Sequence, residues 1–226
     1  MERPMSCGLA GLALLLGGCG WNGSLDDLGW RQEEPPLQRV LVEADDTPGN
    51  QSLLYTALRE AEAAEQSATR ARLAADDPAE ARQALGEVLY AVEPSAAPDW
   101  RAMATGIVPG WSGEGYGVLH AARQIRAGLS AAEAQPGETG TAAGQALVCA
   151  ENTIRRSEQI LDLGRRAMEG GDTIPESTLV EIEALATQLT EGATTTAGAS
   201  ANSDSGCGLE RAVRILNGLA INPMPV

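Results

Sequence analysis

Beyond residue 50, apolar side chains recur every three or four positions, which is the spacing of one face of an α-helix. Three such stripes occupy residues 54–75, 81–92 and 118–129, and the first consists mostly of alanine. The motif Asp77-Pro78-Ala79-Glu80 precedes the second stripe. It has the composition of a helix start, with an N-cap aspartate, a proline at the first helical position and a glutamate able to reach back. The pattern predicts three helices in this half of the chain.

The second half repeats this order of elements. Further helical stripes occupy residues 147–168, 179–189 and 209–219, and the helix of the second begins near Pro175. Two short motifs also recur at nearly equal offsets: Gly115-Tyr116-Gly117 is matched by Gly206-Cys207-Gly208, and Glu65-Gln66 by Glu158-Gln159. We therefore predict an all-α bundle of about six helices, in which two duplicated three-helix units, residues 51–135 and 140–220, pack together. The alternative to duplication is chance similarity between the sequences of alanine-rich helices.

A long glycine-containing loop precedes the last helix of each unit, at residues 93–117 and 192–206. Loops of this length within a domain are usually functional or disordered. Oxygen-bearing side chains in flexible turns can converge on Ca²⁺. The candidate ligands are Asp99, Glu114, Asn202, Asp204 and Glu210. The EF-hand order of ligands is not met, so linkers that end in glycine caps are the competing interpretation.

The chemistry available to the chain is narrow. Its formal charge is −15 and all its basic residues are arginine, because the sequence contains no lysine. The negative charge argues against a nucleic-acid partner, since phosphates attract basic surfaces. The lack of lysine excludes a P-loop, a Schiff base and a Ser-Lys dyad. We expect Arg155-Arg156 and Arg165-Arg166 to pair with nearby carboxylates, and an anionic ligand is the alternative for them.

No complete catalytic or cofactor motif is present. His120 is the only histidine, which excludes a multi-histidine metal site, and no Cys-x-x-Cys-His haem motif occurs. Met103 is a conceivable second ligand to a metal or haem beside His120, but the spacing does not specify it. A boundary histidine with an ordinary hydrogen bond is the preferred interpretation. We therefore predict a protein that is not an enzyme and carries no cofactor.

The N-terminus carries the most specific signal. A short apolar run over residues 9–16 leads into Leu16-Gly17-Gly18-Cys19, with Arg3 as the one basic residue before it. This segment resembles the signal peptide of a bacterial lipoprotein, in which the lipobox cysteine becomes lipid-modified. The resemblance implies removal of residues 1–18, acylation of Cys19 and a membrane anchor outside the cytoplasm, on the periplasmic face or the cell surface. The alternative is a buried N-terminal helix with an incidental cysteine.

Residues 19–50 are acidic and contain prolines, which predicts a flexible tether between the anchor and a helical domain over residues 51–226. Residues 37–42 are the one apolar island in the tether, a candidate for a short helix or strand that docks on the domain. With Cys7 removed and Cys19 acylated, Cys149 and Cys207 remain, and an even pair in an oxidising compartment usually bonds. Two buried free thiols are the alternative.

Taken together, these expectations favour a membrane-anchored binding or scaffold module that engages a protein partner near the membrane surface. A divalent-cation or small-ligand binding protein that uses the two glycine-ended loops is the alternative. A redox or haem-bearing bundle is a third class.

Overall fold

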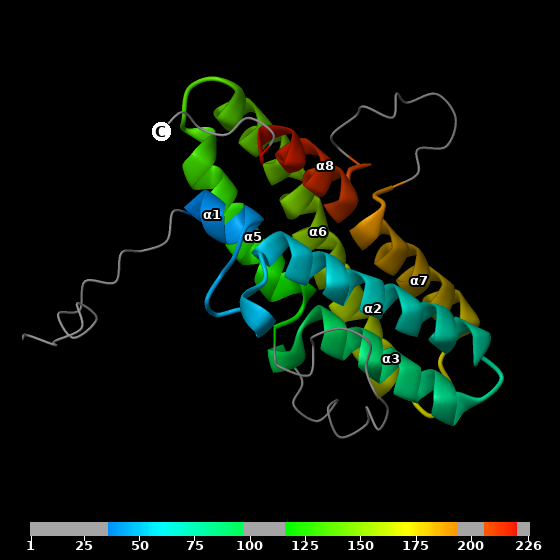
Figure 1. Cartoon of the computed structure of the whole chain (residues 1–226). Helices are drawn as coiled ribbons and strands as arrows, with labels where there is room; N and C mark the ends of the chain where they lie inside the picture. The colour runs from blue at the N-terminus through cyan, green and yellow to red at the C-terminus, as the bar shows by residue number, and fades with distance from the viewer. Residues whose placement is uncertain (1–35, 97–115, 194–205, 221–226) are drawn as a thin grey trace, which may run out of the picture. The chain divides into compact units, whose positions relative to one another are not determined.

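Helices make up nearly all of the chain that the structure, a computed structural model, describes, namely residues 36–96, 116–193 and 206–220 (Figure 1). The helices within these ranges are α1 (Pro36–Leu41), α2 (Leu53–Leu73), α3 (Pro78–Val92), α5 (Val118–Glu133), α6 (Glu138–Glu169), α7 (Glu176–Thr190) and α8 (Leu209–Ala220). Two short 3₁₀ turns, η2 (Pro48–Asn50) and η3 (Pro94–Ala96), complete them. The predicted all-α fold is confirmed, and each of the six predicted helices is present.

Local chemistry fixes the starts of α2 and α3. The hydroxyl of Ser52 accepts a hydrogen bond from the backbone N–H of Tyr55 at 3.1 Å. The carboxylate of Asp77 accepts two, from the N–H groups of Ala79 and Glu80 at 3.1 and 3.2 Å. Such caps satisfy donors that the first helical turn leaves unpaired, and each contributes about 1 kcal/mol. The predicted aspartate cap of the second helix is therefore confirmed.

The described chain begins at Pro36, within the segment that the sequence predicts as a tether. The apolar island forms helix α1, whose Val40 is fully buried, and Ala44 and Thr47 after it are also buried. Gly128 on α5 permits this contact, because a Cβ there would lie 2.8 Å from a methyl group of Val40. The apolar island of the predicted tether is thus a short helix docked on the domain, which is one of the two forms that the sequence leaves open for it.

Helix α6 is the longest element and contacts most of the others. It contacts α5 along both halves, its N-terminal half also contacts α8, and its C-terminal half also contacts α3 and α7. Helix α2 also packs against both α3 and α7, so these four helices surround a shared core. Figure 1 shows α8 lying along α6, and α2 between α3 and α7. The stripe predicted on α2 supplies part of this core through alanines that are at most 1% exposed: Ala57, Ala61, Ala64, Ala68 and Ala71.

The two halves use the same pairwise contacts. Helix α2 packs against α3 and α5, and α6 packs in the same way against α7 and α8. At the start of α5, a Cβ on Gly117 would lie 2.8 Å from the carbonyl oxygen of Val92, the last residue of α3. At the start of α8, a Cβ on Gly208 would lie 2.5 Å from the carbonyl oxygen of Thr190, the last residue of α7. This is the geometry that duplication requires, and the duplication itself stays a prediction.

Candidate functional site

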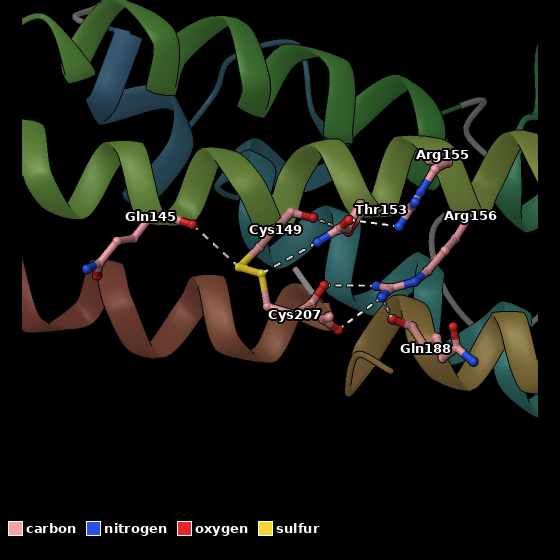
Figure 2. Close-up of a disulfide and its surroundings, with 9 residues drawn as sticks. Gln145, Cys149, Thr153, Arg155, Arg156, Gln188 and Cys207 are labelled. Atoms are coloured by element: carbon pink, nitrogen blue, oxygen red, sulfur yellow. Dashed lines mark hydrogen bonds between the residues drawn. A yellow bond between two sulfur atoms is a disulfide. The ribbon is translucent and has the colours of Figure 1, made fainter. Parts of the chain in front are cut away.

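A disulfide between Cys149 and Cys207 joins helix α6 to the short segment that precedes α8 (Figure 2). The two Cα atoms are 5.1 Å apart, and the bond closes a separation of 58 residues. Cys149 is fully buried and Cys207 is 7% exposed. The side-chain nitrogen of Asn152 lies 3.9 Å from the sulfur of Cys207. The predicted pairing is therefore confirmed, and the bond lies inside the packed domain.

Arg156 lies beside the disulfide and is almost completely buried, with 3% of its surface exposed. Its guanidinium donates hydrogen bonds to three backbone carbonyls: those of Gln188 and Cys207 at 2.9 Å and that of Gly206 at 3.0 Å. Figure 2 shows the side chain extending from α6 toward the end of α7 and the segment before α8. One side chain thus connects three parts of the second unit.

The electrostatics of Arg156 explain how a cation is tolerated there. Burial lowers the pKa of Arg156, and the neighbouring charge of Arg155 lowers it further. Arginine nevertheless keeps its charge at physiological pH. The carbonyl of Gln188 belongs to the last turn of α7, where the helix dipole is negative. The guanidinium therefore meets the negative end of a helix and two more carbonyls in place of a carboxylate.

Close backbone contacts hold the same junction. The N–H of Ala193 donates to the carbonyl of Gly206 at 2.6 Å, and Gly192 pairs with Cys207 in an isolated antiparallel bridge. Gly192 has a φ of +94°, and a Cβ on Gly208 would lie 2.5 Å from its nitrogen. The chain thus leaves α7 and enters α8 through glycines that this close contact requires.

The equivalent position in the first unit is held by a different polar cluster. Tyr116, which takes the place of Cys207 in the repeated motif, is buried with its ring edge-on to His120 at a centroid distance of 4.9 Å. The side-chain oxygen of Gln124 accepts from Arg39 at 2.8 Å, and Arg39 also pairs with Asp46 at 2.8 Å. This cluster ties α1 to α5.

His120 makes the ordinary hydrogen bond that the sequence predicts. Its Nε2 lies 2.8 Å from the side-chain nitrogen of Gln124. Because the oxygen of that amide faces Arg39, we assign the Gln124 nitrogen as donor and Nε2 of His120 as acceptor. The ring is exposed at the start of α5. Burial, together with the charge of Asp46, raises the pKa of Tyr116 to about 12, so the phenol beside His120 is neutral.

Only one of the five predicted calcium ligands, Glu210, belongs to the residues that the structure describes. Asp99, Glu114, Asn202 and Asp204 lie outside the described ranges, as do Met103 and Cys19. Glu210 is in the first turn of α8 and is exposed. Within residues 36–96, 116–193 and 206–220, no group of three or more His, Cys, Asp or Glu side chains could hold a metal ion.

The arginines of the two pairs on α6, Arg155-Arg156 and Arg165-Arg166, differ in how far they are buried. Arg166 pairs with Asp162 at 2.9 Å, as predicted, and Arg155 donates to the side-chain oxygen of Asn152 at 3.0 Å. Sequence reasoning missed the burial of Arg156. The signal was present, because Cys149, Thr153, Arg156 and Ile160 follow one another at steps of four, three and four and share the buried face of α6.

A second carbonyl-binding arginine, also missed, lies on α3. Arg82 donates to the carbonyl of Met168 at 2.9 Å and to that of Gly171, and so caps the end of α6. Both arginines satisfy carbonyls that a helix end leaves unpaired. The planar guanidinium, with several donors in a fixed fork, suits this role better than the lysine that the chain lacks.

None of the helices in the described ranges is long and apolar enough to cross a membrane. No protein-family model, curated protein or solved structure matches the chain.

Proposed function

We propose that this chain is an extracytoplasmic lipoprotein, anchored through acylated Cys19, whose helical domain acts as a binding or scaffold module. The observation that carries the proposal is the disulfide between Cys149 and Cys207 inside the packed domain. Structural disulfides form and persist in oxidising compartments and are rare in the cytosol. The lipobox at Leu16-Gly17-Gly18-Cys19 supports the same location independently.

The start of the packed chain sets how far the module reaches. Seventeen residues, 19–35, connect the anchoring cysteine to α1. Even fully extended, they span at most about 60 Å. A partner therefore lies close to the membrane surface, in the same membrane or directly beside it.

The charge of the chain indicates the chemistry of that partner. The net charge is −15, and α7, whose sequence is ESTLVEIEALATQLT, carries three glutamates and no basic residue. Complementary potentials steer protein association, whereas anionic lipid repels an acidic surface. We propose a protein partner that presents arginine or lysine side chains, so that binding weakens as salt is added.

Mass spectrometry of the protein isolated from membranes of its native host tests the anchor. The expected product begins at Cys19 and carries acyl mass, and a Cys19→Ala variant should lack that mass and keep residues 1–18. A soluble wild-type protein that retains Met1 would contradict the proposal.

Vesicles prepared from native membranes test the partner. The chain from residue 20 onward, which has neither the signal segment nor the acylated cysteine, should bind them saturably, and salt or protease treatment of the vesicles should abolish binding. Binding that survives protease treatment would point to lipid instead. Calorimetry addresses the alternative function: two comparable Ca²⁺ sites would favour a cation-binding protein over a scaffold.

A further inference from the structure

The disulfide and Arg156 act on the same segment from the same face of α6. Cys149 and Arg156 are two helical turns apart, and both are buried. Cys149 bonds the sulfur of Cys207, whereas the guanidinium of Arg156 holds the carbonyl oxygens of Cys207 and Gly206. The same two-residue segment is thus fixed once through a covalent bond and once through hydrogen bonds.

The hydrogen bonds do not involve sulfur. They join a side chain to backbone oxygens, so they can form while both cysteines are thiols. Arg156 also binds the carbonyl of Gln188 at the end of α7, so its guanidinium is held in place beside the seat of residues 206 and 207. Seating that segment gives the guanidinium two charge-assisted hydrogen bonds, which are stronger than hydrogen bonds between neutral groups. The guanidinium therefore favours a chain in which residues 206 and 207 are already seated on α6.

We infer that Arg156 is the positioning residue for this disulfide: it seats Cys207 beside Cys149 before oxidation, and the covalent bond then locks a junction that is already formed. The inference concerns assembly of the second unit and does not depend on the anchor or on a partner. The inference depends on the planar, forked shape of the guanidinium group. One guanidinium nitrogen reaches the carbonyls of Gln188 and Cys207 while the other reaches Gly206, an arrangement that a lysine ammonium cannot reproduce.

The oxidation step requires an external disulfide, for which glutathione disulfide is the test reagent. The thiolate of one cysteine attacks glutathione disulfide and forms a mixed disulfide, releasing one glutathione thiolate. The second cysteine, as thiolate, attacks the protein sulfur of the mixed disulfide and releases the second glutathione. The two protein thiols lose two protons and two electrons, and glutathione disulfide is reduced to two thiols. Seating of Cys207 accelerates and favours the second step, because the attacking and attacked sulfurs are already adjacent.

The thiol–disulfide equilibrium of the full chain with glutathione tests the inference. Arg156→Lys keeps the charge but loses the fork, and we expect the equilibrium constant for formation of the disulfide to fall at least about tenfold. Arg82→Lys is the matched control. Arg82 binds two carbonyls at the other end of α6 and contacts neither cysteine, so its variant should keep the wild-type constant.

Two results would overturn the inference: an unchanged constant in Arg156→Lys, or an equal fall in both variants, which would reflect a general loss of packing. Hydrogen exchange on the reduced wild-type protein gives an answer even if Arg156→Lys does not fold. The amide of Ala193, which donates to the carbonyl of Gly206, should stay protected in the reduced protein, because Arg156 still holds Gly206. Exchange of that amide at the rate of an unstructured chain would show that the disulfide, and not Arg156, seats the segment.

Discussion

Gly164 on α6 lies directly against the side chain of Leu89 on α3, so that no side chain fits between the two helices at this point. Leu89 is fully buried. A methyl group at position 164 would therefore force repacking. We expect Gly164→Ala to lower the free energy of unfolding by about 1–3 kcal/mol, measured by urea denaturation.

Gly218 supplies the matched control within the same protein. It lies in helix α8, is exposed, and has no atom within 4 Å of where its Cβ would lie. There the intrinsic preference of alanine for helix should dominate, and Gly218→Ala should raise stability by about 0.5–1 kcal/mol. Equal effects at the two positions would mean that α3 and α6 do not pack closely at Gly164.

A second prediction concerns the ion pair between Arg70 on α2 and Glu87 on α3. The Glu87 side chain is only 2% exposed, and it also lies 3.4 Å from the hydroxyl of Ser67. Arg70→Ala leaves this carboxylate buried without its cation, so we expect a loss of about 3 kcal/mol on thermal or urea unfolding.

The pair between Arg166 and Asp162 is the control for this prediction. Both of its side chains are about two-thirds exposed, at 65% and 68%. Pairs of this kind contribute about 0–1 kcal/mol because water and salt screen them. Arg166→Ala should therefore have little effect. A loss as large as that of Arg70→Ala would show that the difference in burial does not set the energies of these pairs.

Local signals in the sequence were sufficient to predict the helices. The cap at Asp77 and the apolar stripes depend only on residues close in the chain, and they gave the helices their correct order. The partner of Cys149 followed from counting cysteines, and the ordinary role of His120 followed from its position beside a stripe. Each of these features is fixed by chemistry within one element or by composition.

The features that the sequence did not reveal depend on contacts between distant segments. The sequence marks residues 37–42 as a candidate docking segment, but where it docks depends on the room that Gly128 on α5 provides for Val40. Arg156 looks like a surface cation, because arginine is mostly exposed in proteins. Its burial depends on carbonyls from Gln188 and Cys207, which become neighbours only after α7 and α8 have packed. The candidate calcium ligands fall largely outside the described residues and stay a prediction.

The disulfide should contribute strongly to global stability. In the chain-entropy model, a closed loop of 58 residues is worth about 4 kcal/mol. We expect the double variant Cys149→Ser and Cys207→Ser to lose a comparable amount in urea denaturation. Peptide mapping without reduction should recover the linked pair from protein exported by its native route. Alkylatable thiols at both positions would contradict the pairing and, with it, the proposed extracytoplasmic location.

Tyr116 should make folding sensitive to alkaline pH. Burial is the main cause that raises its pKa from 10.0 to about 12 in the folded chain. The folded state therefore holds the phenolic proton more tightly than the unfolded state does. The stabilisation is fully present below pH 10 and is lost as pH rises through 12, by an amount on the order of 2–3 kcal/mol. Denaturation between pH 9 and 12 should show this decline, and Tyr116→Phe should reduce it. The same change at Tyr55, which is 44% exposed, is the control. If the two variants lose stability alike over this range, Tyr116 is not the group responsible.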